Sequence, residues 1–140
     1  MKRDLFKWTK GIAACILFSS TAFSQEELLL ITTPQVKISY VRGNCDVETG
    51  KQAYQFAFLK IENLTNASLH AGFNIVVQYD EGCAGCNGSD ESLYYVSLSP
   101  NQVYSASCGT DDKTKVYLRN PNFSGAWNFQ ELRIENLIVE

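Results

Sequence analysis

The stretch from Leu69 to Asp80 reads LHAGFNIVVQYD, and it decides the fold class of this chain. Apolar and polar side chains alternate along it, which places every second residue on the same side of an extended chain. One side carries His70, Asn74 and Gln78, which suit contact with water. The alternation predicts a half-buried β-strand whose inner face consists of Leu69, Ala71, Phe73, Ile75, Val77 and Tyr79.

The same period of two extends in both directions from this strand, with turn residues about every 8 to 12 positions. No window keeps the apolar spacing of an amphipathic helix over three turns. Pro34 ends an early apolar piece, because proline cannot donate a hydrogen bond to a neighbouring strand. A change of phase after Phe129 and another near Leu137 indicate one or two β-bulges in the last strand. Besides 69–80, the expected strands are 28–33, 36–41, 54–62, 93–98, 103–108, 115–119 and 127–139.

Many short strands joined by short turns favour an all-β fold, namely an antiparallel two-sheet sandwich of about seven strands. A small closed barrel is the alternative. The segments LKIEN at 59–63 and VSLSPN at 96–101 resemble strand and turn patterns of small bacterial secreted domains of the immunoglobulin-like or fibronectin III-like kind. The resemblance implies an immunoglobulin-like β-sandwich. It points to no functional residue, since such sandwiches serve adhesion, carbohydrate binding and spacing alike.

The N-terminus has the three-part layout of a secretory signal. Four basic residues fall within the first ten positions, an apolar stretch spans Gly11–Phe18, and small residues lead to Ser24. We therefore expect a signal peptide at 1–24, a single domain at 25–140, and a secreted or periplasmic location. One alternative is an amphipathic N-terminal helix of the folded domain. The other is a lipid anchor at Cys15, because the sequence from Ile12 to Cys15 resembles a bacterial lipobox.

Composition and charge narrow the classes of partner. The chain is 45% hydrophobic, which is too high for a disordered protein. Without its leader it has 8 Lys and Arg against 14 Asp and Glu, a net charge of -6. A nucleic-acid partner is not expected, because phosphate binding needs a basic surface. No apolar run approaches the roughly 18 residues of a membrane span, so no transmembrane segment is expected.

Four cysteines follow the leader: Cys45, Cys83, Cys86 and Cys108. If successive strands run antiparallel, strands 36–41, 69–80 and 103–108 all end at the same pole, which gathers the four cysteines there. An even number in an oxidising compartment indicates disulfides, with three connectivities open. We favour Cys45 with Cys108 and Cys83 with Cys86. The first bridge closes a long loop and should stabilise the fold by roughly 3 to 5 kcal/mol.

Other chemistries stay open as alternatives at this pole. A zinc site with four cysteine ligands is one, although such sites usually pair two CxxC motifs. A metal- or thiol-dependent enzyme is another, although a reactive CxxC usually lies at a helix N-terminus. Acidic loop residues could hold calcium, but no calcium-loop spacing is present. His70 is the only histidine and lies too far from Asp80 to form a triad, so we expect neither an enzyme nor a resident metal or cofactor.

Aromatic residues are the remaining functional signal. Large rings on an outer strand face could form a stacking platform for sugar rings or a contact patch for a protein. Packing in the core is the alternative for most of them. The expected partner is therefore an unknown protein or carbohydrate, with candidate binding residues Phe56, Phe58, Tyr94, Tyr95 and Trp127.

Overall fold

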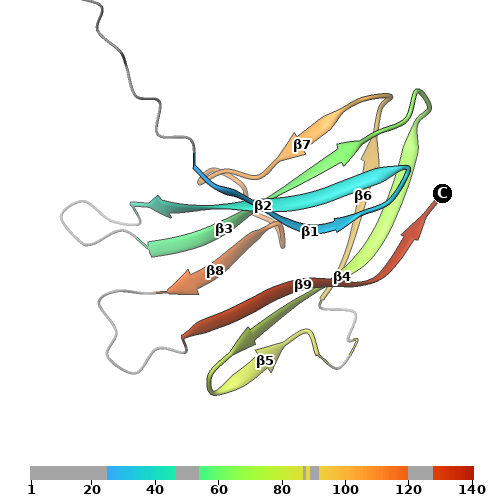
Figure 1. Ribbon diagram of the computed structural model, residues 1–140. Coiled ribbons are helices and arrows are strands. Elements are labelled where there is room, and N and C mark those ends of the chain that lie inside the picture. The colour runs from blue at the N-terminus through green and yellow to red at the C-terminus, as the bar shows by residue number, and fades with distance from the viewer. Residues whose placement is uncertain (1–24, 47–53, 87, 89–91, 120–127) are drawn as a thin grey trace, which may run out of the picture.

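The computed structural model describes residues 25–46, 54–86, 88, 92–119 and 128–140. The expected signal peptide at 1–24 lies outside the described residues, as do Trp127 and Cys15, the site of the alternative lipid anchor. Figure 1 shows the described part as two layers of strands. The strands are β1 (Glu27–Thr32), β2 (Val36–Cys45), β3 (Tyr54–Asn63), β4 (Leu69–Tyr79), β5 (Gly82–Ala84), β6 (Leu93–Leu98), β7 (Val103–Ser105), β8 (Lys115–Arg119) and β9 (Phe129–Val139).

All pairings between these strands are antiparallel, in two sheets. Sheet A has the order β1-β2-β3, and both β7 and β8 pair with the remaining edge of β3. In sheet B, β4 lies in the centre, with β9 along one edge and β5 and β6 along the other. The expectation of an all-β, two-sheet antiparallel fold is confirmed. Among the described residues no span of helix is long and apolar enough to cross a membrane.

The core lies between the two sheets. Its centre is the apolar face of β4, whose Phe73 is fully buried, and it packs against Ile38 of β2 and Leu59 and Ile61 of β3. The predicted inner face of 69–80 is therefore confirmed. The prediction of a half-buried strand is wrong for its other face, where Asn74 is only 6% exposed and Val76 is fully buried. β4 has neighbouring strands on both sides, and the Asn74 side chain donates to the Ser92 hydroxyl at 2.7 Å.

The order of strands near Cys108 differs from the sequence-based expectation. Segments 103–108 and 115–119 were expected to be successive antiparallel strands, but β7 and β8 run in the same direction along β3. They are two halves of one broken edge, and the connecting segment 106–114 leaves the edge of β3 after Ala106 and returns to it at Thr114. The break is closed at Leu59, whose N–H donates to Thr114 and whose carbonyl accepts from Ala106, both at 2.9 Å. The alternation of side chains in a short segment does not show which strand it pairs with. The shared edge of β7 and β8 could therefore not be predicted from the sequence.

Sheet B has a similar broken edge. β5 pairs with β4 at Val77 to Tyr79, and β6 pairs with it from Leu69 to Asn74. The sequence pattern gave no strand at β5, because a Gly- and Cys-rich segment does not alternate. β9 shows the expected bulges, with register shifts opposite Gly72/Asn74 and Gln78/Tyr79. Asn136 adopts a φ of 52° within the first of these irregularities.

An ion-pair network on the outer face of sheet A fastens β1 to its neighbours. Glu27 accepts hydrogen bonds from Lys37 at 2.7 Å, Ser39 at 2.9 Å and Lys60 at 3.1 Å. Glu62 bridges the same two lysines from β3. The bonds from Lys37, Ser39 and Lys60 lower the pKa of Glu27 to about 2. The edge strand β1 is therefore held by ion pairs as well as by its backbone hydrogen bonds with β2.

Candidate functional site

The structure contains the two disulfides favoured from the sequence. Cys45 at the end of β2 is bonded to Cys108, with Cα atoms 5.6 Å apart, and Cys83 in β5 is bonded to Cys86, with Cα atoms 5.7 Å apart. The bridge to Cys108 fastens residues 106–114 to the end of β2. Cys108 reaches this position from the excursion between β7 and β8, and not from the end of a strand as expected, since β7 stops at Ser105.

The ends of β2 and β4 lie at the same pole of the sandwich, as the direction of the strands predicted. Arg42 of β2 lies 5.2 Å from the ring centre of Phe129, which pairs with Tyr79 at the end of β4. The Tyr79 hydroxyl in turn donates to the carbonyl oxygen of Tyr117 in sheet A at 2.7 Å. The two bridges are nevertheless held by different sheets, Cys45 by sheet A and Cys83 by sheet B.

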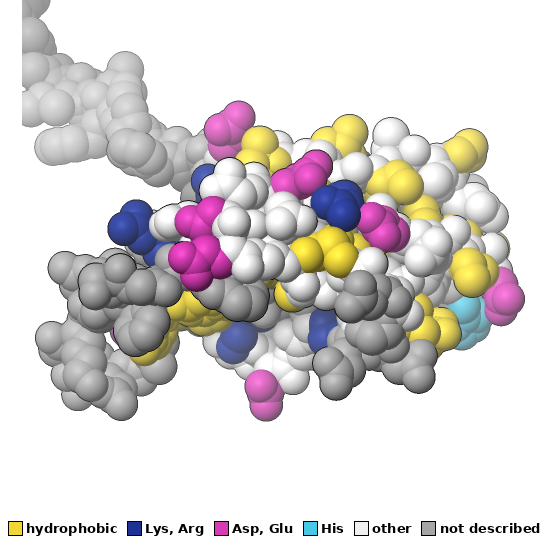
Figure 2. Space-filling model, turned by 90° about the horizontal axis from the view of Figure 1, so that it is seen from below, with side chains coloured by type: hydrophobic (Ala, Val, Ile, Leu, Met, Phe, Trp, Pro, Cys, Tyr) yellow, Lys and Arg dark blue, Asp and Glu magenta, His cyan; other side chains and the backbone are white. Residues whose placement is uncertain are grey.

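The chemistry of the cysteines follows from their bonding. A thiolate is the form of cysteine that attacks a substrate or binds zinc, and all four of these sulfurs are tied up in disulfides. Within the described ranges, no group of three or more His, Cys, Asp or Glu side chains is placed to hold a metal ion. Arg133 of β9 brings its guanidinium to within 3.7 Å of the Cys86 sulfur, but it also pairs with Glu131 at 3.1 Å and Glu135 at 2.7 Å. Figure 2 shows this side of the molecule, with acidic and basic side chains next to one another.

The aromatic candidates do not form one surface. Phe56 and Phe58 lie on the outer face of sheet A, with ring centres 6.1 Å apart, and the ring of Tyr117 meets Phe56 edge-on at 5.8 Å. Phe58 is buried, because Cys45 and Ala106 pack over it under the disulfide-linked excursion. Phe56 and Phe58 therefore belong largely to a small second core. The sequence did not predict that Phe58 is covered, because the covering segment around Ala106 is distant from it in the chain.

Tyr94 and Tyr95 face opposite ways, as neighbours in a strand must. Tyr94 points inward and packs on Phe73 with ring centres 5.7 Å apart. Its burial, together with its hydrogen bonding toward Tyr104, raises the pKa of its hydroxyl. Tyr95 points outward from sheet B and is 72% exposed, the most exposed of the large apolar side chains that the structure describes.

The ring of Tyr95 lies over a glycine of the neighbouring strand. Gly72 of β4 is its cross-strand partner, and a Cβ added to Gly72 would stand only 2.6 Å from a ring carbon of Tyr95. The missing side chain therefore lets the ring rest on the backbone of the sheet. One ring face is supported from below, and the large exposed fraction shows that the rest of the side chain meets solvent.

Four further side chains share this outer face around Tyr95. Ile138 of β9 is the other cross-strand partner of Gly72 and is 61% exposed. His70 lies two residues before Gly72 in β4 and pairs with Ser97 of β6. The Ser97 hydroxyl lies 2.8 Å from the Nδ1 atom of His70. On the opposite side of His70, its backbone exchanges two hydrogen bonds of 2.8 Å with Glu140. We call the group formed by His70, Tyr95, Ser97, Ile138 and Glu140 the Tyr95 platform. Of this group the sequence predicted only Tyr95 as a binding residue, because the other residues lie on strands whose neighbours could not be assigned from the sequence.

Comparisons with known proteins add no relatives: no family model, no curated protein and no solved structure matches this chain. The resemblance of 59–63 and 96–101 to immunoglobulin-like domains therefore stays a prediction about the family.

Proposed function

We propose that this chain is an exported, non-catalytic binding domain that holds a carbohydrate by stacking a sugar ring on Tyr95. The observation that supports this most directly is a tyrosine ring that is 72% exposed and yet held in place over Gly72. A ring that is already fixed in position loses little entropy when it binds a partner.

The surroundings of the ring match the two-sided chemistry of a sugar. A pyranose presents C–H groups from its faces and hydroxyl groups from its rim. The C–H face can stack on an aromatic ring, which is an apolar surface with a polar end. The imidazole of His70, the hydroxyl of Ser97 and the carboxylate of Glu140 are hydrogen-bonding groups near the same ring, and Ile138 adds apolar surface. A mixed rim of this kind suits hydroxyl groups better than an apolar protein patch would.

We also propose that the protein is exported and that it is not an enzyme. The two disulfides support an oxidising compartment, such as the periplasm or the extracellular space. A non-catalytic role is supported by the position of the single histidine, His70, which lies at the opposite end of β4 from the Cys83–Cys86 bridge.

Affinity electrophoresis against a panel of soluble polysaccharides, followed by isothermal titration with the retarded glycan, tests the proposal. Tyr95→Ala should abolish retardation, while Tyr95→Phe should keep it, since stacking needs the ring and not the hydroxyl. Tyr117→Ala, a ring on the other sheet that is 37% exposed, is the matched control. Binding that survives Tyr95→Ala, or a domain that binds no glycan but captures one protein through Tyr95, would refute the sugar assignment.

A substitution beneath the ring gives a second test that leaves Tyr95 itself in place. Gly72→Ala puts a methyl group where the ring now lies, so the ring must move away from the sheet. We expect a loss of glycan affinity of roughly tenfold, which corresponds to about 1.4 kcal/mol. Gly43→Ala, which meets the buried Phe58 on the other sheet at 2.7 Å, should leave glycan affinity unchanged in protein that folds. Equal affinities for the Gly72→Ala variant and the parent chain would show that the supported ring is not the binding element.

A further inference from the structure

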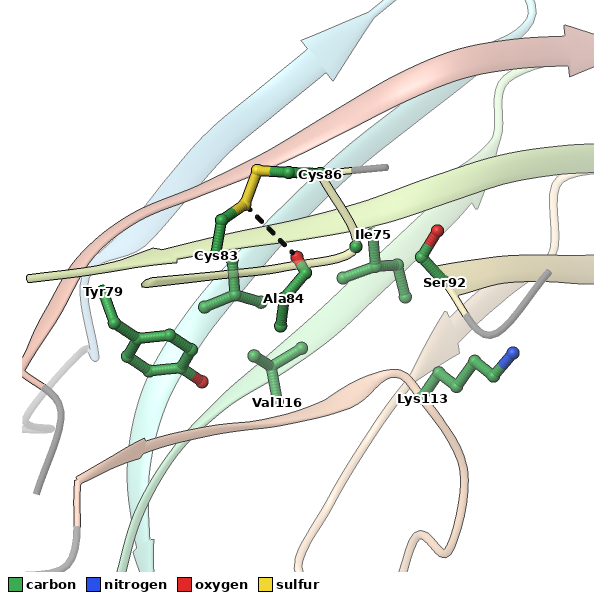
Figure 3. Close-up of a pocket in the computed structure, with 10 residues that line it drawn as sticks. Ile75, Tyr79, Cys83, Ala84, Cys86, Ser92, Lys113 and Val116 are labelled. Atoms are coloured by element: carbon green, nitrogen blue, oxygen red, sulfur yellow. Dashed lines mark hydrogen bonds between the residues drawn. A yellow bond between two sulfur atoms is a disulfide. The ribbon is translucent and has the colours of Figure 1, made fainter. Parts of the chain in front are cut away.

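The Cys83–Cys86 bridge lies at the rim of the sandwich. On the side away from β1 and β9, β5 and the start of β8 flank a cleft of about 700 Å³. Figure 3 shows that Ala84 points into this cleft toward Val116, whereas the two sulfur atoms lie on the opposite side of β5. Neighbours in a strand face opposite ways, so Cys83 belongs to the outer face of sheet B. Because Cys86 is also exposed, the bridge can be reached from solvent without passing between the sheets.

An arginine on the same outer face lies next to the bridge. Arg133 of β9 is the cross-strand partner of Val76 in β4, and its Nη2 atom lies 3.7 Å from the Cys86 sulfur. Its other two nitrogens are held by carboxylates, Nε by Glu135 at 2.7 Å and Nη1 by Glu131 at 3.1 Å. The two ion pairs therefore fix the guanidinium in the orientation that directs Nη2 to the sulfur.

The contact with Arg133 favours the reduced form of Cys86. A disulfide sulfur makes little use of the donor, because it carries no charge and is a weak acceptor. A thiolate at the same place would accept a charge-assisted hydrogen bond, which is about twice as strong as one between neutral groups. Glu131 and Glu135 offset part of the guanidinium charge, but both side chains are exposed and screened by solvent. The Nη2 hydrogen, in contrast, is directed to the sulfur itself.

The backbone around this bridge is held by contacts that do not need the disulfide. β5 pairs with the end of β4. Gly85, between the two cysteines, has a φ of 81° and lies so close to β4 that an added Cβ would stand 2.5 Å from the Ile75 carbonyl oxygen. The bridge can therefore open and close again without disturbing the core. Cys45–Cys108 differs, because Cys45 is buried and its bridge fastens the segment that covers Phe58.

We propose that Cys83–Cys86 is an exchange-active disulfide that accepts two electrons from a dithiol, with Cys86 as the attacked sulfur and Arg133 beside its thiolate. One thiolate of the dithiol attacks the Cys86 sulfur and forms a mixed disulfide, while the Cys83–Cys86 bond breaks and leaves its electron pair on Cys83, which takes up a proton. The second thiolate of the dithiol then attacks the dithiol sulfur of the mixed disulfide. The dithiol becomes a disulfide, and Cys86 leaves as a thiolate at Arg133. The same steps in reverse restore the bridge when the oxidised dithiol is in excess.

This exchange site is independent of the Tyr95 platform. The bridge lies beside the end of β4, whereas Tyr95 rests on Gly72 farther back along that strand. A reactive CxxC usually takes its stabilising positive charge from a helix N-terminus, and here a guanidinium takes that place. Either proposal can therefore fail while the other stands.

Equilibration of the folded, oxidised chain with mixtures of reduced and oxidised dithiothreitol at pH 7 tests the selectivity of the exchange. After an acid quench and alkylation, peptide mass spectrometry counts the free thiol at each cysteine. Cys83 and Cys86 should become alkylated together in mixtures that leave Cys45–Cys108 closed. Opening of both bridges over the same range of mixtures, or of Cys45–Cys108 first, would overturn the proposal.

A variant without the guanidinium tests the part of Arg133. Arg133→Gln should raise, by roughly tenfold, the ratio of reduced to oxidised dithiothreitol at which half of the Cys83–Cys86 bridges are open, because the Cys86 thiolate loses a charge-assisted hydrogen bond. Arg119→Gln, at an exposed arginine of β8 in sheet A, is the matched control and should leave the ratio unchanged. An unchanged ratio in Arg133→Gln would refute the assignment of Arg133.

Two serine variants identify the attacked sulfur. Cys83→Ser leaves Cys86 as a free thiol, and Cys86→Ser leaves Cys83. At pH 7, iodoacetamide should modify Cys86 in the first variant at least about tenfold faster than Cys83 in the second, because Cys86 is exposed and its thiolate lies next to Arg133. Equal rates, or a faster reaction at Cys83, would overturn the assignment of Cys86.

Discussion

At the scale of single residues, two glycines on the outer sheet faces each lie under an aromatic ring. A Cβ on Gly43 would stand 2.7 Å from a ring carbon of Phe58, and one on Gly72 would stand 2.6 Å from Tyr95. Glycine inside a strand usually weakens it, because it has no side chain to pack. Here the ring of a neighbouring strand supplies that cover. The two cases differ in what lies above the ring, since Phe58 is buried under another loop and Tyr95 is exposed.

At the end of the sandwich opposite to Cys45, the side chain of Asn63 joins two turns by hydrogen bonds. It is 3% exposed, and its amide nitrogen donates to the carbonyl oxygens of Ala67 at 2.7 Å and Ser99 at 2.9 Å. Its amide oxygen accepts from the N–H and the hydroxyl of Thr65. One side chain therefore fixes the turn after β3 and joins it to the turn after β6.

Replacement of Asn63 should be costly because the four hydrogen bonds of a buried side chain are lost. We expect Asn63→Ala to lower the free energy of unfolding by about 2 to 4 kcal/mol. Chemical denaturation followed by circular dichroism measures it. Asn66→Ala, at an exposed asparagine of the same turn, should cost less than about 0.5 kcal/mol. Similar losses for the two variants would show that the turn is not organised by Asn63.

At the scale of elements, each sheet has one edge built from two collinear strands with an excursion between them. In sheet A the excursion between β7 and β8 is joined to β2 by Cys45–Cys108. In sheet B the chain leaves the edge after β5, where Cys83–Cys86 closes a short turn, and returns as β6. Interrupted edges offer few consecutive free backbone groups to another chain, which limits edge-to-edge pairing.

The two disulfides should differ in how much they stabilise the fold. The loop-entropy relation gives roughly 4 kcal/mol for the 63-residue separation of Cys45 and Cys108, and roughly 1 to 2 kcal/mol for the 3-residue separation of Cys83 and Cys86. Replacing Cys45 and Cys108 together by serine should therefore lower the unfolding free energy by more than the same change at Cys83 and Cys86. Urea denaturation of the two double variants measures the difference. The opposite ranking would mean that the 106–114 excursion is held by packing on Phe58 and not by its bridge.

At the scale of the whole molecule, the sandwich has one closed side, where β1 meets β9, and one open side, where the cleft lies. The platform around Tyr95 belongs to neither side but to the outer face of sheet B.

The signal peptide expected at 1–24 and the two disulfides together predict the mass of the mature protein. We expect the mature protein to begin at Gln25 and to weigh less than the reduced chain by the four hydrogens lost in two disulfides. Intact-mass spectrometry with and without reductant, after thiol alkylation, measures both. Alkylated cysteines in the unreduced sample, or a lipid mass on Cys15, would contradict an oxidised and unanchored product.

The sequence by itself determined the all-β class, most strand positions, the inner face of β4 and the bulges of β9, whereas it left three pairings of the cysteines open and only favoured the one that the structure has. These follow from alternation and parity, which are local properties: each residue's side is set by its immediate neighbours in the chain. Only the tertiary structure decided that β7 and β8 share one edge of β3, that Phe58 is covered, and that Tyr95 rests on Gly72 beside His70 and Ile138. Those facts depend on which strands become neighbours, and partners are chosen by the packing of the whole core, which no local pattern encodes.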